Sequence, residues 1–95
     1  MNFKKLSQGE RIACMASLLD RISPDCGYSD WLVALMVVFT ETHGGDDGFE
    51  LVDRWSSKGQ TYKGRRDVEK YWNRFSLNHK KPLRIGSLIR LANSR

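Results

Sequence analysis

The sequence predicts an all-α fold, a compact bundle of about five helices around a central hydrophobic helix. Apolar residues recur at intervals of three and four along nearly the whole chain, which is the pattern of helices that bury one face. Glycine and proline residues separate these periodic segments and mark turns. Residues 29–42 are apolar around the whole helical circumference, so the other helices have to enclose this segment. A chain of 95 residues has the size of a single domain, residues 1–95.

The first predicted helix spans residues 8–22. Ser7 and Glu10, three residues apart, form the pattern of a capping box at its N-terminus. Pro24 prevents the helix from continuing. The apolar side chains share one arc of the helix, and they are Ile12, Met15, Ala16, Leu18, Leu19 and Ile22.

The second predicted helix, residues 29–42, is the central one. Its β-branched residues would also suit a buried strand, but the flanking turns and the length of about 14 residues favour a helix. Its apolar run, residues 31–39, is well short of the ~20 residues that span a bilayer, so no membrane contact is predicted.

A glycine-rich turn separates the second helix from the third, which is predicted over residues 47–57. We expect Gly44 or Gly45 to end the second helix and Asp46 or Asp47 to cap the third. The paired aspartates do not form a calcium loop, because an EF-hand needs a longer series of oxygen ligands ending in a glutamate. The third helix places its apolar residues on one arc, namely Phe49, Leu51, Val52 and Trp55.

The fourth predicted helix, residues 65–75, has two faces. At the spacing i, i+3, i+4, i+7 lie Val68, Tyr71, Trp72 and Phe75, and at the spacing i, i+4, i+8, on the opposite side, lie Arg66, Lys70 and Arg74. This pattern predicts that Trp55 and Trp72 belong to the core and are not a platform for base stacking. Tyr62, in the preceding loop, is the one ring expected to stay partly exposed, and packing is favoured even there.

The last predicted helix spans residues 87–93, with Ser87 as its cap. The N–H groups of its first turn are expected to be free, beside Lys80, Lys81 and Arg84. Such an arrangement suits a phosphate group.

Charge is distributed unevenly between the two parts of the chain. Residues 1–53 hold four Lys/Arg against nine Asp/Glu, a net charge of −5, whereas residues 54–95 hold twelve against two, a net charge of +10. This asymmetry indicates contact with an anionic polymer. The candidate contacts to nucleic acid are Lys63, Arg65, Arg66, Lys70, Asn73, Arg74, Lys80, Lys81, Arg84 and Arg90. About four to six phosphate contacts would make binding steeply salt-dependent. Asn73 alone suits base reading, so we expect single-stranded or forked DNA with weak sequence preference.

No catalytic, metal or cofactor site is predicted. Cys14, Cys26, His43 and His79 match no zinc-ligand spacing, and the cysteines are expected to be reduced. The sequence contains no phosphate-binding Gly-x-x-x-x-Gly-Lys-[Ser/Thr] loop, and no nucleophile–base set is brought together by spacing. No charged-then-apolar leader opens the chain, so a cytoplasmic location is expected.

Residues 25–92 resemble the family known as primase C-terminal domain 2, which leaves the helix at residues 8–22 as an N-terminal addition. The resemblance rests on the order and approximate spacing of Asp25, Tyr28, Trp31, Gly48, Phe49, Trp55, Ser56, Tyr62, Trp72, Phe75, Ser76, Ile85, Gly86, Ser87, Leu88 and Ala92. The second helix departs from the family pattern by its bulkier Leu35, Val37 and Val38.

The resemblance implies an accessory domain that follows a primase or primase–polymerase module, often ahead of a helicase, in phages, plasmids and other mobile elements. It implies a role in replication initiation, through template contact or communication between domains. The chain itself contains no catalytic primase module.

The predicted function is therefore a non-catalytic nucleic-acid-binding accessory domain of a phage or mobile-element primase–helicase system. The alternative is a protein-interaction module, which could be an adaptor, a decoy or a phage inhibitor. Such a module would dock on a primase, a helicase or another nucleic-acid-handling complex. It would need an exposed apolar patch, for which Phe3, Leu6 and Met36 are the candidates.

Overall fold

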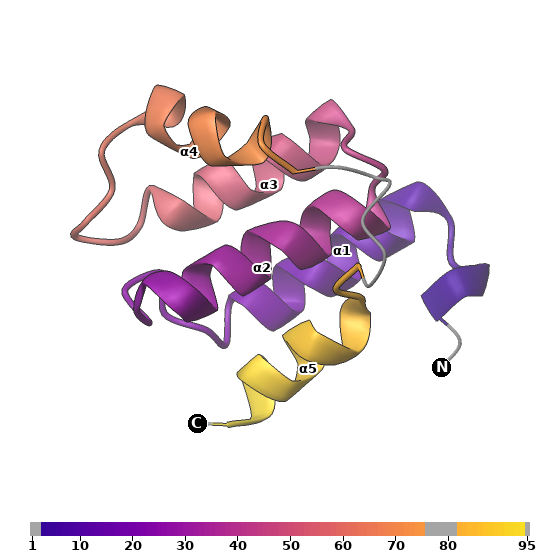
Figure 1. Cartoon of the computed structure of the whole chain (residues 1–95). Helices are drawn as coiled ribbons and strands as arrows, with labels where there is room; N and C mark the ends of the chain where they lie inside the picture. The colour runs from indigo at the N-terminus through magenta and orange to yellow at the C-terminus, as the bar shows by residue number, and fades with distance from the viewer. Residues whose placement is uncertain (1–2, 76–81, 95) are drawn as a thin grey trace.

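The computed structural model describes residues 3–75 and 82–94, and it confirms the all-α prediction (Figure 1). Within these ranges the chain forms helices and connecting turns, with no strand. The elements are the 3₁₀ helix η1 (Phe3–Lys5) and the α-helices α1 (Gln8–Leu19), α2 (Tyr28–Glu41), α3 (Asp46–Ser56), α4 (Arg65–Trp72) and α5 (Ile85–Asn93).

Helix α2 is the centre of the bundle, as predicted. It packs against each of the other four α-helices. Helices α3 and α4 lie on one side of it and α5 on the opposite side (Figure 1). Ala34, Leu35, Val37 and Val38 are fully buried. The helix is not enclosed all round, because residues 31–33 and 36 are only half-buried. Four short helices cannot cover every side of a fifth in so small a chain.

The predicted tryptophan anchors are in the core. Trp55 and Trp72 are 4% and 6% exposed. The indole N–H of Trp55 donates to the Ile22 carbonyl at 2.9 Å, so its one polar atom is satisfied. The Trp72 ring meets Phe39 and Phe49 edge to face, with ring centroids 5.1 and 5.8 Å apart. These contacts join α4 to α2 and α3.

The N-terminus of α1 has the predicted capping box. The Ser7 hydroxyl accepts from the Glu10 N–H at 3.2 Å, and the Glu10 carboxylate accepts from the Ser7 N–H at 2.9 Å. The other end is shorter than predicted, because α1 stops at Leu19. The N–H groups of Arg21 and Ile22 bond three residues back, which tightens the chain into turns.

The turn between α2 and α3 differs from its prediction in the residues that end α2 and cap α3. His43, with φ of 54°, holds the left-handed position after α2, and the Gly44 N–H donates to the Phe39 carbonyl at 2.9 Å. Gly44 itself has φ of 72°, so glycine takes part in the stop as expected. The predicted aspartate cap is wrong, since Gly45 is the N-cap of α3 and makes no side-chain bond. Asp46 and Asp47 lie in the first turn, where the helix dipole favours negative charge.

The start of α5 corrects the prediction for Ser87. The helix begins at Ile85, and its N-cap residue Arg84 makes no side-chain capping bond. Instead the carboxylate of Glu41, at the end of α2, accepts from the Ile85 N–H at 2.8 Å. It also accepts from two nitrogens of Arg84, both at 3.2 Å. Of the first-turn N–H groups expected to be free for phosphate, that of Ile85 is therefore taken by a buried protein carboxylate, and that of Ser87 donates to the Arg84 carbonyl at 2.9 Å.

Helix α4 ends at Trp72, three residues before its predicted end. Arg74 and Phe75 follow in a turn in which their N–H groups bond to the carbonyls of Tyr71 and Trp72. No helix in the described part of the chain is both long and apolar enough to cross a membrane.

Candidate nucleic-acid interface

Three cations form a row along α4 and the turn that follows it. This cation row, defined as Arg66, Lys70 and Arg74, is exposed along its length. None of the three forms an ion pair with another described residue. Arg66 and Lys70 are separated by one turn of α4, a rise of about 6 Å, which is comparable to the phosphate spacing along one strand. Arg74 follows in the turn after the helix. The row therefore offers positive charge that no ion pair within residues 3–75 and 82–94 neutralises.

Two predicted contacts belong instead to ion pairs with the acidic part of the chain. Arg65 forms a two-pronged contact with the Glu50 carboxylate and approaches Asp53 at 3.6 Å. Its guanidinium also lies over the Phe49 ring, 4.7 Å from the centroid. The Arg65 hydrogen bond lowers the pKa of Glu50, and the same bond raises the pKa of Arg65. Arg84 is held in the same way by Glu41.

The remaining residues predicted to contact nucleic acid lie in different parts of the structure. Asn73, the C-cap of α4, is exposed and directly precedes Arg74. Lys63 is exposed in the loop before α4 and lines the same pocket as Tyr71. Arg90 is exposed on α5, a helix that lies on the opposite side of α2 from α4 (Figure 1). Lys80 and Lys81 lie outside the described residues.

Tyr71 connects the cation row to a pocket. Its ring centroid is 6.0 Å from the Lys70 ammonium and 6.0 Å from the Arg74 guanidinium carbon. Its other neighbours are aromatic: the Trp31 and Tyr28 ring centroids lie at 5.2 and 5.9 Å. Tyr71 was predicted to face the core with Trp72, but it is only half-buried. Tyr71 does pack against the core, as predicted, but it also lies beside two cations, so the separation of aromatic and basic groups onto opposite faces is incomplete at this residue.

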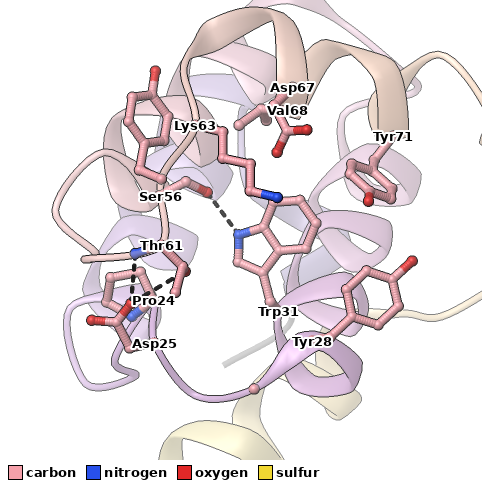
Figure 2. A pocket seen from close by; sticks show the side chains of 12 residues that line it. Pro24, Asp25, Tyr28, Trp31, Ser56, Thr61, Lys63, Asp67, Val68 and Tyr71 are labelled. Carbon is pink, nitrogen blue, oxygen red and sulfur yellow. Dashed lines mark hydrogen bonds between the residues drawn. The ribbon is translucent and has the colours of Figure 1, made fainter.

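The aromatic pocket has a volume of about 290 Å³ and lies between α2, α4 and the loop before α4 (Figure 2). Its lining consists of Pro24, Asp25, Gly27, Tyr28, Trp31, Ser56, Thr61, Tyr62, Lys63, Asp67, Val68 and Tyr71. Tyr28 stands at the rim and is 60% exposed, an unusual fraction for a large ring.

Hydrogen bonds fix the walls of this pocket. The Trp31 indole N–H donates to the hydroxyl of buried Ser56 at 2.9 Å (Figure 2). The Asp25 carboxylate accepts from the Gln60 N–H at 2.9 Å and from the Thr61 N–H at 3.4 Å. These bonds tie the loop before α4 to the start of α2. The pocket is therefore built from two segments, residues 24–31 and 56–71, which are joined by bonds that span 25 and 35 positions of the chain.

Tyr62 packs as predicted. It is half-buried, and its hydroxyl donates to the Asp53 carboxylate at 2.8 Å. That bond raises the pKa of the Tyr62 phenol, because ionisation would place two negative charges together.

The pocket was not predicted from the sequence, because the residues of each wall fit the usual pattern of a helix or a loop when that segment is considered alone. A signal was available in the order of residues, since Tyr71 directly follows Lys70 and Tyr28 precedes Trp31 by three positions. The apolar patch proposed for protein docking is wrong, because Phe3 is only 9% exposed and Leu6 and Met36 are half-buried.

Residues 3–75 and 82–94 contain no group of three or more His, Cys, Asp or Glu side chains placed to hold a metal ion. Cys14 and Cys26 are not joined in a disulfide. His79 lies outside the described residues.

Comparison with known families gives one match. The family model described as primase C terminal 2 (PriCT-2) matches residues 15–92, which is nearly the whole chain. No curated protein and no solved structure shows significant similarity to the chain. The match includes the C-terminal part of α1, residues 15–19, which the resemblance seen in the sequence had left outside the family region. The chain thus belongs to the primase C-terminal 2 family, and it is a small helical accessory domain associated with primases in replication.

Proposed function

We propose that this chain is a non-catalytic nucleic-acid-binding domain of a phage or mobile-element primase–helicase system, and that it holds DNA phosphates on its cation row. The observation that carries the proposal is the contrast between cations. Arg65 and Arg84 are paired with acidic side chains, whereas Arg66, Lys70 and Arg74 have no such partner among the described residues. Charge that is left exposed and aligned suits an external polyanion.

The three cations of the row and Lys63 determine how many phosphates the domain can contact. Four cations that each neutralise one phosphate give a slope of log K against log salt of about −3 for a single strand, at roughly −0.7 per phosphate. Such contacts position the strand but carry no sequence information. Asn73, exposed at the end of α4, can read a base edge through its side-chain amide.

The test is a fluorescence-anisotropy titration of labelled single-stranded, forked and duplex DNA at low and high salt. The triple variant Arg66→Glu/Lys70→Glu/Arg74→Glu should lose binding to all three ligands. Its melting temperature should be unchanged, because exposed substitutions typically alter stability by less than ~0.5 kcal/mol.

A matched control variant distinguishes the effect of losing the cation row from the effect of lowering the net charge. Lys5, Arg21 and Arg54 are exposed cations outside α4 and outside the candidate contacts, and their triple reversal to glutamate changes the charge by the same amount. The control should retain most of the affinity. Equal losses in the two triple variants would show that the row has no special part in binding, and absence of wild-type binding would refute the proposed function.

Within a replication system the natural partner is the primase or helicase with which such a domain is associated. We place both in the cytoplasm. A pull-down after nuclease treatment distinguishes a direct protein contact from one bridged by DNA.

A further inference from the structure

We propose that the aromatic pocket receives one unpaired base of a single strand while Lys70 and Arg74 hold the adjacent phosphate. This inference rests on the proposed function and adds a site to it. It makes the domain a reader of single-stranded rather than duplex nucleic acid. The decisive feature is that Tyr71 belongs to both sites. Its ring has Lys70 and Arg74 as cationic neighbours, and the rings of Trp31 and Tyr28 as aromatic ones.

The pocket has the shape and lining that a base requires. Its volume of about 290 Å³ is at the lower end of small-ligand pockets, which suits a planar ring rather than a larger ligand. Tyr28 and Tyr71 are inclined at 64° and Trp31 and Tyr71 at 87°, so the walls present ring faces and ring edges. Every base has a π-face, and stacking on aromatic side chains is how single-strand-binding proteins hold bases.

The pocket is prepared before any ligand arrives. The bond from Trp31 to Ser56 fixes the indole, and the Asp25 carboxylate fixes the loop that carries Thr61 and Lys63. Tyr28 is 60% exposed, so its ring is available for contact without unfolding the helix. Pre-organised walls lower the entropy cost of binding.

Two polar side chains lie where the edge of a base would be. Lys63 and Asp67 line the pocket (Figure 2), and no ion pair joins either to a described residue. A carboxylate accepts from an exocyclic amino group such as that of cytosine, and an ammonium donates to a ring carbonyl. Thymine lacks such an amino group and offers a carboxylate only its single ring N3–H. We therefore expect cytosine, adenine and guanine to be preferred over thymine.

A duplex cannot use this pocket, because its bases are stacked on both faces and paired along their edges. A duplex would need to extrude a base, which costs unstacking and unpairing energy. The cation row, by contrast, can contact the phosphates of either form. The two sites therefore predict two separable components of binding.

An aromatic pocket could also receive a proline-rich peptide, since such peptides dock in aromatic-lined grooves. The base is favoured by charge, because three cations, Lys63, Lys70 and Arg74, lie in or beside the pocket. The lining also holds two carboxylates, of which Asp25 is already bonded to backbone N–H groups and Asp67 is the proposed acceptor for a base. An anionic ligand with a planar ring matches this combination, and a neutral proline helix does not.

The test compares Tyr28→Ala with the ring-retaining Tyr28→Trp in the full chain. Anisotropy is measured with labelled oligo-dC, oligo-dT and a duplex. Tyr28→Ala should weaken oligo-dC binding by about 5- to 150-fold, the range for loss of one stacked base, and should leave duplex binding unchanged. Tyr28→Trp should restore the single-strand affinity. Asp67→Asn should remove the preference for oligo-dC over oligo-dT.

A second arm distinguishes a base within a strand from a free nucleotide. Trp31 is half-buried in the pocket, whereas Trp55 and Trp72 are buried in the core, so tryptophan fluorescence reports on Trp31. Oligo-dC should alter this fluorescence at far lower concentration than dCMP. Equal potency of dCMP would reassign the site to a free nucleotide.

The two proposals fail in different ways. Loss of single-strand and duplex binding in equal measure in Tyr28→Ala, or no loss at all, would overturn the base pocket while the cation row stands. Displacement of oligo-dC from the pocket by a proline-rich peptide at equal or lower concentration would also overturn it. No binding of wild-type protein to either nucleic acid would overturn the proposed function itself.

Discussion

Replacing Glu41 by glutamine is expected to destabilise the fold through the start of α5. Glu41 is 3% exposed, and its carboxylate accepts one bond from the Ile85 N–H at 2.8 Å and two from Arg84 at 3.2 Å. Glutamine keeps the shape of the side chain and removes the charge. The change therefore isolates the electrostatic part of this cap.

The magnitude follows from the three bonds. Hydrogen bonds to charged groups contribute about 1.5–3 kcal/mol and neutral ones about 0.5–1.5, so the Ile85 bond weakens by about 1 kcal/mol. Loss of a negative charge at the N-terminus of α5 adds about 0.3–1 kcal/mol. The Arg84 side chain is 52% exposed, so water compensates for much of its lost partner. The expected cost of Glu41→Gln is about 1–2 kcal/mol, a fall in Tm of roughly 5–15 °C.

The assay is urea unfolding followed by circular dichroism, with Arg84→Ala and Glu41→Ala as companions. Arg84→Ala should cost at most about 1 kcal/mol, because it removes only the exposed partner. Glu41→Ala should cost about 2–4 kcal/mol, because it also leaves the Ile85 N–H without an acceptor. If Arg84→Ala proves as costly as Glu41→Gln, the ion pair and not the helix cap is the main contribution, and the reasoning is wrong.

Three further predictions concern other parts of the molecule. His43→Gly should raise stability by about 0.5–1 kcal/mol in the same unfolding assay, because φ of 54° is strained for any residue with a Cβ; a loss of stability would contradict this. The depressed pKa of Glu50 implies stability that is present at neutral pH and is lost as the pH falls below about 4.3 through the folded-state pKa. Between pH 6 and pH 3, the free energy of unfolding should fall less in Arg65→Ala than in the wild type. An equal fall in the two proteins would refute the pairing of Glu50 with Arg65. Asn73→Ala should leave the salt dependence of DNA binding unchanged while altering preferences among oligonucleotides, since an amide neutralises no phosphate; a shallower slope in anisotropy titrations would contradict that role.

The sequence predicted those parts of the fold that depend on local pattern. The α1 capping box, the central α2 and the burial of Trp55 and Trp72 all follow from spacing within one segment. The start of α5 could not be predicted in this way, because its cap comes from Glu41, 44 residues before Ile85. No helical pattern around Ser87 can reveal an acceptor supplied by another helix.

The candidate interface shows the same division. The cation row could be read from a single helix, since Arg66, Lys70 and Arg74 recur every four residues. The pairing of Arg65 with Glu50 could not be predicted from one helix, because it depends on how α4 packs against α3. The aromatic pocket was missed for that reason too, as Tyr28 and Tyr71 meet only in the folded chain.

The salt dependence of single-strand binding, measured for wild type and for the triple glutamate variant of the cation row, tests the central claim most directly. Three lost phosphate contacts should make the slope of log K against log salt shallower by about 2, at roughly 0.7 per contact. A slope that is the same in both proteins would contradict the assignment of Arg66, Lys70 and Arg74 as the phosphate-binding surface.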